Sequence, residues 1–317
     1  MQAIARDGVG KIASTLVYTV TNGTAGTGYL RRFLESNLKD AEIHGDRAGW
    51  LDLGVNCPDA SHLTRFNTLG NLPEIRAFWR RKLAADANSA KDVLVDLTHL
   101  HAKAGLVENL DLVPDGVRVV LIHLRHGVKD TVWTIHNRCD FRNSGFTWVH
   151  SLDPNYQNVM VPSGQFAQQG MAGLALWYVV EMRTRAAFYK RLTNDMAQVD
   201  FTEIWLGELV RQQPGAQDLL TLITGTPPQG VAPAEETETQ PVRPGGQEVQ
   251  PGSAAEKQMA KGARPAGDMF GEDTKQNVMK MIDRFKWNAE ALAEDFYASG
   301  RRLGNPALGH TASKALH

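Results

Sequence analysis

The sequence predicts an α/β protein in which a parallel β-sheet lies between helices in three layers. Short continuous apolar runs recur along the chain, as expected for strands that are buried on both faces of a parallel sheet. Stretches with apolar residues at helical spacing separate these runs, and such alternation is typical of α/β folds. The three strongest runs are residues 16–20, 93–97 and 117–124. A chain of 317 residues, 42% hydrophobic, is long enough to bury such a sheet.

The first run leads into the stretch that carries the clearest functional signal, residues 14–34. Gly23, Gly26 and Gly28 follow the predicted strand, and the residues after them have helical spacing. Glycines let backbone N–H groups converge, and the start of a helix adds partial positive charge. The sequence therefore predicts an anion-binding turn at this place.

The turn matches neither of two common phosphate-binding motifs. Gly23 and Gly28 have the GxxxxG spacing of a P-loop, but Tyr29 and Leu30 follow where an NTPase has Lys and Ser or Thr. The glycine order is also GxxGxG, whereas the dinucleotide motif is GxGxxG. A divergent dinucleotide site and a purely structural turn both remain open as alternatives.

The stretch TNGTAGTGYL resembles the phosphosulfate loop of sulfotransferases, usually TYPKSGTTWL, with Thr21, Gly26, Thr27 and Leu30 matching. The resemblance implies an enzyme of the bacterial sulfotransferase-like branch, with a P-loop-like fold and 3′-phosphoadenosine 5′-phosphosulfate (PAPS) as donor. In that family the loop holds the 5′-phosphosulfate, and the aromatic residue after it stacks on the adenine. The resemblance thus assigns donor binding to Thr21, Gly23, Thr24, Gly26, Thr27, Gly28 and Tyr29, and charge stabilisation to the Thr27 hydroxyl. Thr24 stands where the family has a basic residue.

A second candidate follows the run at 93–97, where Thr98-His99-Leu100 stands at the predicted strand end. Ligands of open α/β sheets bind at the carboxyl ends of strands. Imidazole suits proton transfer because its ordinary pKa lies near neutrality. In sulfotransferases a similar element supplies the general base, so the resemblance assigns that role to His99. A histidine bonded within the sheet edge is the alternative.

A third candidate is Arg125, which ends the run at 117–124 and precedes a helix predicted from about Lys129. An arginine there can bind phosphate with its planar fork. The segment resembles the sulfotransferase element RNPKDVAVS, whose arginine and serine bind the 3′-phosphate of PAPS. Arg125 and Thr134 carry that pattern here with one extra residue between them, so either the turn is longer or His126 replaces the arginine. A capped helix with a surface ion pair is the alternative.

The other elements are read more coarsely. Short strands are expected at 41–44 and 199–204, and helices at 72–83, 169–191 and 205–212. Residues 50–71 show no sustained period and are expected to be irregular. We assign residues 14–224 to the α/β domain, 225–267 to a disordered linker rich in Pro and Gly, and 268–317 to a C-terminal segment. One amphipathic helix is expected there, docking on the domain itself or on a protein partner.

Net charge and cysteine content limit the classes of function that the sequence allows. A net charge of −1 gives no basic footprint for nucleic acid or an anionic membrane. Two cysteines are too few for a disulfide framework, and neither a signal peptide nor a membrane span is visible, so we expect a cytoplasmic protein. His136 and Cys139 have no matching partner pair, so no metal is expected.

The sequence therefore predicts an enzyme that moves a sulfuryl group from PAPS to a small-molecule or glycan acceptor. Two rivals remain. One is a nucleotide-binding scaffold without catalysis, suggested by Thr24. The other is an NAD(P)-dependent oxidoreductase, in which an acidic residue at 43–46 would bind ribose.

Overall fold

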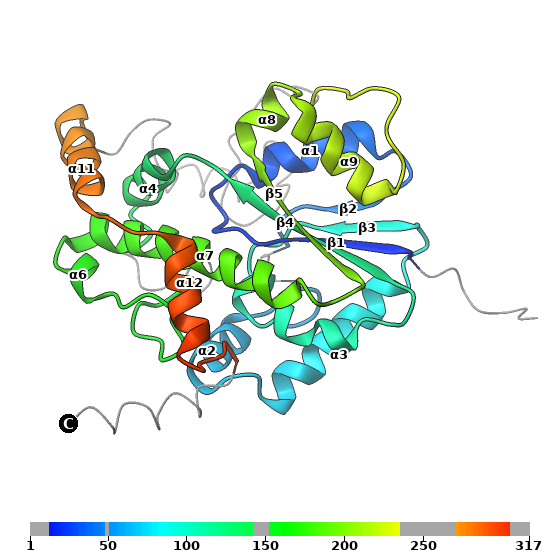
Figure 1. Ribbon diagram of the computed structural model, residues 1–317, viewed down its shortest axis with the longest axis horizontal. Helices are drawn as coiled ribbons and strands as arrows, with labels where there is room; N and C mark the ends of the chain where they lie inside the picture. Colours follow the sequence, from blue (N-terminus) through cyan, green and yellow to red (C-terminus); the bar gives the residue numbers. More distant parts are fainter. Residues whose placement is uncertain (1–12, 48–50, 142–151, 235–269, 305–317) are drawn as a thin grey trace, which may run out of the picture.

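A computed structural model describes residues 13–47, 51–141, 152–234 and 270–304 (Figure 1). They build one five-stranded sheet in the order β2-β3-β1-β4-β5, in which every neighbouring pair is parallel. The predicted α/β class and parallel sheet are confirmed. The strands are β1 (Thr15–Thr19), β2 (Glu42–His44), β3 (Val93–Asp96), β4 (Arg118–Arg125) and β5 (Val199–Trp205).

Helices cover both faces of the sheet and form the outer two layers (Figure 1). Successive residues of β1 face opposite cores: Leu16 and Tyr18 lie in one and Val17 in the other. The Val17 core holds α1 (Thr27–Asn37), α8 (Leu206–Val210) and α9 (Pro214–Thr224). The opposite core holds α2 (Ala60–Leu69), α3 (Pro73–Ala87), α4 (Val128–Asn137), α6 (Gly164–Ala167) and α7 (Gly170–Thr193), with the 3-10 turns η1 (His101–Lys103) and η2 (Val107–Leu112).

The segment at 50–71 is less irregular than the sequence predicts, because α2 forms within it. Asp59 caps this helix, its carboxylate accepting from the backbone N–H of His62 at 2.9 Å. The His62 side chain completes the reciprocal cap in the place that Glu or Gln usually takes. The cap rather than a long apolar period marks this helix, which explains why periodicity alone misses it.

Two helices stand where the sequence predicts one amphipathic C-terminal helix: α11 (Glu272–Arg284) and α12 (Ala289–Ala298). Both pack on the α/β domain (Figure 1). Phe285 between them stacks on Phe166, with ring centroids 4.9 Å apart. Phe296 of α12 meets Phe188 of α7 edge to face. The break follows from Asn288, whose side chain caps α12. Of the predicted linker, residues 235–267 lie outside the described residues, while Ala232 exchanges two hydrogen bonds with the Asn37 side chain.

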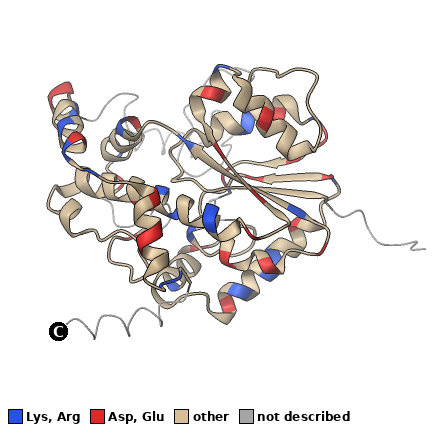
Figure 2. Ribbon diagram, in the orientation of Figure 1, with Lys and Arg blue, Asp and Glu red and all other residues tan. Residues whose placement is uncertain are grey.

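Charges of both signs are interspersed over the helices on either side of the sheet (Figure 2). This distribution accords with the near-zero net charge. None of the helices in the described part of the chain combines the length and apolarity that crossing a bilayer requires.

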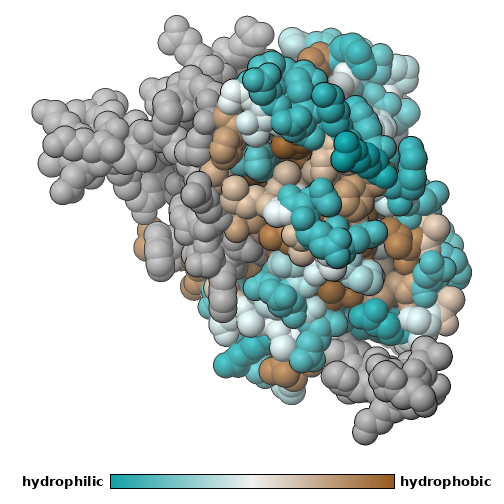
Figure 3. Space-filling model, turned by 90° about the vertical axis from the view of Figure 1, so that its left-hand side faces the viewer, coloured by the Kyte–Doolittle hydropathy of each residue, from teal (hydrophilic) through white to brown (hydrophobic). Residues whose placement is uncertain are grey.

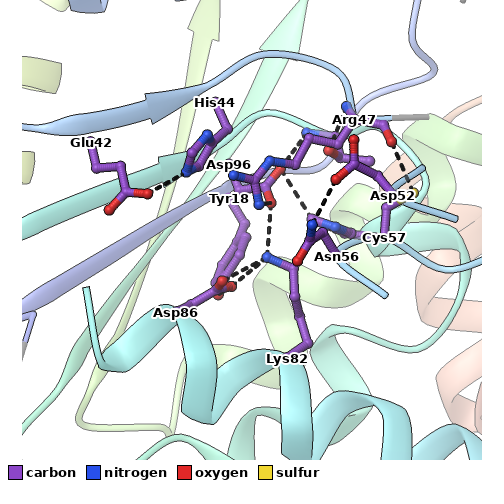
Figure 4. Close-up of polar contacts among 12 residues, drawn as sticks. Tyr18, Glu42, His44, Arg47, Asp52, Asn56, Cys57, Lys82, Asp86 and Asp96 are labelled. Carbon is purple, nitrogen blue, oxygen red and sulfur yellow. Dashed lines mark hydrogen bonds and ion pairs between the residues drawn. The ribbon is translucent and has the colours of Figure 1, made fainter. Parts of the chain in front are cut away.

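A buried network of charges joins α3 to the sheet (Figure 4). The Lys82 ammonium lies 2.9 Å from the Asp96 carboxylate at the end of β3 and 2.6 Å from that of Asp86. The Tyr18 hydroxyl of β1 donates to Asp86 at 2.6 Å. Burial alone would raise the pKa of Asp96, but neighbouring His101 and Lys82 outweigh it and hold that pKa below its usual range. The network therefore fixes the end of β3, from which His99 follows.

Replacing Asp96 with Asn should destabilise the protein by about 3–5 kcal/mol at pH 7, because the substitution leaves Lys82 buried with one partner fewer. Urea unfolding measures this. Asp111→Asn, which breaks an exposed pair with Arg76, is the control and should cost less than about 1 kcal/mol. Equal losses in the two variants would contradict a structural role for the network.

Candidate functional site

The candidate site lies at the carboxyl ends of β1 and β4, in the middle of the sheet. The connection after β1 leads to β2 on one side of it, whereas the connection after β4 leads to β5 on the other. A crevice opens at such a topological switch point, and open α/β sheets bind ligands there. The glycine turn follows β1 directly, so the fold places the predicted anion-binding turn in this crevice.

Two glycines shape the turn. Gly23 and Gly26 have φ of 85° and 96°, a left-handed conformation that side chains rarely adopt. Asn22 Oδ1 accepts from both the backbone N–H and the hydroxyl of Thr24, at 2.9 and 3.0 Å. The Thr24 side chain therefore holds the turn and offers no positive charge.

The turn ends in a set of backbone donors. Gly26 is the N-cap of α1, and no side chain caps this end of the helix. Among the described residues, the N–H groups from Ala25 to Gly28 donate no hydrogen bond. Successive N–H groups at a helix start, with its partial positive charge, are the usual backbone site for a phosphate or sulfate. Thr27, predicted to stabilise charge, is the first residue of this helix and is half-buried.

His99 lies against the same turn. Its ring packs on Gly23 so closely that a Cβ built there would come within 2.9 Å of two ring carbons. His99 Nδ1 is 2.7 Å from an Asp46 carboxylate oxygen. A carboxylate at Nδ1 fixes the imidazole tautomer and leaves the lone pair on Nε2. Asp46 is thus the partner of His99, a role that the sequence did not suggest because 53 positions separate them.

Arg125 faces the cavity from the end of β4. Its guanidinium donates to a Glu203 carboxylate oxygen of β5 at 3.0 Å and lies 4.4 Å from the Trp205 ring centroid. Its Nε is buried without a hydrogen-bond partner in the described ranges. A hydrogen bond from His123, with Lys190 beside it, outweighs burial and lowers the pKa of Glu203 to about 2. Glu203 is therefore ionised at neutral pH and forms an ion pair with the Arg125 guanidinium.

Arg183 of α7 is a second guanidinium at this cavity that sequence reasoning missed. It donates to the His126 carbonyl at 2.7 Å and lies 6.0 Å from the Trp205 ring that also contacts Arg125. Burial first, and then the Arg125 charge, lower the pKa of Arg183 to about 10. Both cations line one cavity together with Thr21, Asn22 and Ala25 of the glycine turn.

Two predicted residues lie away from this cavity. Thr134 is exposed on α4, and its hydroxyl donates to the Asp130 carbonyl. Thr131, one turn earlier, lines the cavity with Thr21 and Asn22. Tyr29 packs against the core of α1, where the Arg32 guanidinium lies 5.8 Å from its ring.

Lys103, at the end of η1, is a further residue without a clear sequence signal. Its side chain is fully buried, and its ammonium lies 5.2 Å from the Tyr178 ring centroid. The Tyr178 hydroxyl donates to the backbone carbonyl of Asn22 in the glycine turn. The Tyr178 side chain therefore contacts both Lys103 and the glycine turn.

Two cavities lined by described residues differ in character. The cavity between the turn, Arg125 and Arg183 is about 20 Å³, enough for one water molecule. The other, of about 500 Å³, is largely apolar and lies between α6 and α12, with Phe166 and Trp287 in its walls. The Trp287 ring centroid lies 5.8 Å from the Arg183 guanidinium, so one wall residue of the larger cavity is a neighbour of an arginine that lines the smaller one. Figure 3 turns this side of the molecule toward the viewer and shows apolar residues gathered among hydrophilic ones. In the described ranges, no three His, Cys, Asp or Glu side chains converge as metal ligands.

No family model matches the sequence, and no curated protein matches it. Among solved structures, the chain matches a crystal structure of a sulfotransferase from Alicyclobacillus acidocaldarius. The two are 15% identical, the match covers 72% of this chain and 87% of that chain, and the TM-score is 0.38. A likeness this distant assigns no activity, so function has to be inferred from the residues of the site.

Gly23→Ala tests the contact between the turn and His99. The methyl group would meet the His99 ring, so urea unfolding should show a loss about 1–3 kcal/mol greater than that of a matched control. Gly116→Ala is that control, because Gly116 has φ of 81° but open space where Cβ would lie. Both variants carry the same left-handed strain, and equal losses would show that the His99 contact is unimportant.

Proposed function

We propose that this protein is a sulfotransferase-like enzyme that transfers the sulfuryl group of PAPS to a hydroxyl or amine of an acceptor. The observation that carries the proposal is that one glycine turn holds both a set of anion-binding N–H groups and the side chain of a candidate base. The N–H groups from Ala25 to Gly28 donate no hydrogen bond to any described residue, and the ring of His99, which is paired with Asp46, packs on Gly23 beside them. An anion site and a candidate base next to each other are what sulfuryl transfer needs.

The proposed step assigns a task to each group. The acceptor oxygen or nitrogen forms a bond to sulfur, and its proton passes to His99 Nε2. The bond between sulfur and the bridging oxygen breaks, and the electron pair leaves on the 5′-phosphate of 3′-phosphoadenosine 5′-phosphate (PAP). Backbone N–H groups of the turn and the Thr27 hydroxyl stabilise the charge on the phosphate. Asp46 stabilises the imidazolium that forms.

The structure suits the 5′-phosphosulfate of PAPS better than it suits the 3′-phosphate. The turn suits the phosphosulfate, because glycine leaves room for the anion to approach the backbone. The 3′-phosphate would compete at Arg125 with the Glu203 carboxylate, which accepts one hydrogen bond from that guanidinium at 3.0 Å. The 20 Å³ cavity is also too small for a nucleotide. We therefore expect side chains around Arg125 to rearrange when the donor binds.

A non-catalytic nucleotide-binding scaffold is the second candidate function. It is favoured by Thr24, whose side chain is turned to Asn22, and by Glu203, which neutralises Arg125. A scaffold would bind PAP without turning PAPS over. Binding and turnover therefore separate the two candidates.

We expect PAP to bind the full-length protein, and calorimetry measures the affinity. Arg125→Ala should weaken binding roughly 10- to 150-fold through loss of a charge-assisted contact. Glu203→Gln should strengthen binding, because the guanidinium no longer has an ionised competitor.

Matched controls lie at the opposite end of the same two strands. Arg118 of β4 pairs with Asp200 of β5 at 3.1 Å, as Arg125 pairs with Glu203. Arg118→Ala and Asp200→Asn should leave PAP affinity unchanged. Absence of PAP binding in the unaltered protein would exclude PAPS as its donor.

His99→Asn should slow PAP release from PAPS about 10²- to 10⁴-fold, the usual contribution of a general base, while PAP affinity is retained. Release is measured chromatographically with a panel of phenols, alcohols and amines as acceptors. His44→Asn is the control, because His44 ends the neighbouring strand β2 and pairs with Glu42 at 2.8 Å. PAP binding without turnover of any acceptor in the unaltered protein would favour the scaffold.

A further inference from the structure

One carboxylate oxygen at the Arg125 cavity contacts two side chains at once. Glu203 Oε2 lies 3.0 Å from the Arg125 guanidinium and 3.5 Å from His123 Nδ1. The other oxygen of this carboxylate, Oε1, lies 3.0 Å from the Lys190 ammonium. The sheet register explains the arrangement, because His123 of β4 is directly opposite Glu203 of β5 and Arg125 follows two positions later on the same face. His123 and Arg125 therefore share one oxygen.

His123 is the group of this cluster that can gain a proton near neutral pH. Its side chain is buried, 8% exposed, and lines the same cavity as Arg125. A carboxylate at Nδ1 favours the neutral tautomer with its proton on that nitrogen, which leaves the lone pair on Nε2. Burial lowers the pKa of His123, although Glu203 acts in the opposite direction. The imidazole is therefore uncharged at neutral pH while Glu203 is also paired with Arg125.

The charges around His123 make its protonation sensitive to a bound anion. Arg125 and Arg183 both lower the pKa of His123 by repulsion. A phosphate dianion held by these guanidinium groups would cancel that repulsion and leave Glu203 Oε2 to the imidazole. Glu203 itself stays ionised, since its pKa is about 2. Besides Glu203, the charged or titratable side chains of this cluster come from β4 and the residue after it, from α7 and, acting on Arg183, from α12: Arg125, His126, Arg183, Lys190 and Glu290.

We propose that His123 is a positioning residue of the donor site, which takes up a proton when the 3′-phosphate binds. The Arg125 guanidinium turns its hydrogen bonds to the phosphate, and a proton from solvent adds to His123 Nε2. The imidazolium then donates from Nδ1 to Glu203 in place of the arginine, so the carboxylate stays paired. The inference rests on the proposed function, since it takes PAPS and PAP as the ligands, but it concerns binding and not sulfuryl transfer.

Proton uptake by the unaltered protein is the direct test. Calorimetry at about pH 7.5 in buffers of different ionisation enthalpy gives the number of protons that enter with each nucleotide. At this pH the phosphates are almost fully ionised, because their second pKa is about 6. PAP should take up as much as about one proton more than adenosine 5′-phosphate, which lacks the 3′-phosphate, because one imidazole changes its charge. Any proton taken up beside the 5′-phosphate, at His99 for example, is common to both nucleotides and cancels.

Substitutions identify the imidazole. His123→Asn should remove the excess uptake, because an amide keeps an N–H for Glu203 but gains no proton. PAP should then bind roughly fivefold or more weakly at neutral pH, whereas the affinity for adenosine 5′-phosphate should stay within about twofold. His126→Asn, which alters the other imidazole of the cavity, should keep the excess. His44→Asn should keep it as well, because His44 forms the same kind of pair, with Glu42 at 2.8 Å, outside this cavity.

The pH dependence of affinity has a definite sign. The complex binds the His123 proton more tightly than the free protein does, so the coupling favours PAP at low pH and is lost as pH rises through the pKa of His123 in the complex. Above about pH 7.5, the ratio of PAP affinity to adenosine 5′-phosphate affinity should therefore fall. In His123→Asn this ratio should be flat. A decline of equal size in that variant would contradict the role of His123.

The remaining outcomes separate the inference from the proposed function. Equal proton uptake with the two nucleotides in the unaltered protein would overturn the inference and leave the proposed function standing. Loss of the excess in His126→Asn, with the excess kept in His123→Asn, would also overturn it. If the unaltered protein binds no PAP, the proposed function is wrong and the inference falls with it.

Discussion

The structure depends on the close packing of the His99 ring on Gly23. This contact joins the turn after β1 to the end of β3, and Asp46 adds the segment after β2 through its 2.7 Å contact with His99. Only glycine permits it, since any Cβ would lie 2.9 Å from the ring, in a conformation with φ of 85°. The conformation of the glycine turn and the position of the His99 ring therefore depend on each other at the carboxyl edge of the sheet.

Burial of charge is the second constraint on this site. Lys82 is held by Asp86 and Asp96 within 3 Å, and these contacts anchor the strand that precedes His99. Removing one partner of such a buried pair is costly, because it leaves the other charge without compensation. The contacts of Lys82 therefore hold the strand end that leads to His99.

Helix α7 organises the remainder of the site. It carries Arg183 toward the cavity at β4 and Tyr178 toward the turn after β1. It also supports the C-terminal helices, through Phe188 against Phe296 and through Arg183 near Trp287. The C-terminal segment therefore borders the same arginine as the candidate site, and the 500 Å³ cavity beside it contains Trp287 in its wall.

Local patterns in the sequence determined the strands, the glycine turn and the order of the elements, because these depend on neighbouring residues and on short periods. They also placed His99 and Arg125 at strand ends, which parallel strands bring to one edge. Local patterns missed α2, which is marked by a cap, and α9, and they predicted one C-terminal helix where Asn288 begins a second. Tertiary structure alone decided the partners: Asp46 for His99, Glu203 for Arg125, Arg183 at the cavity, and Tyr178 between Lys103 and the turn. These partners come from other elements of the chain, and no spacing in the sequence encodes which charges the folded sheet brings together.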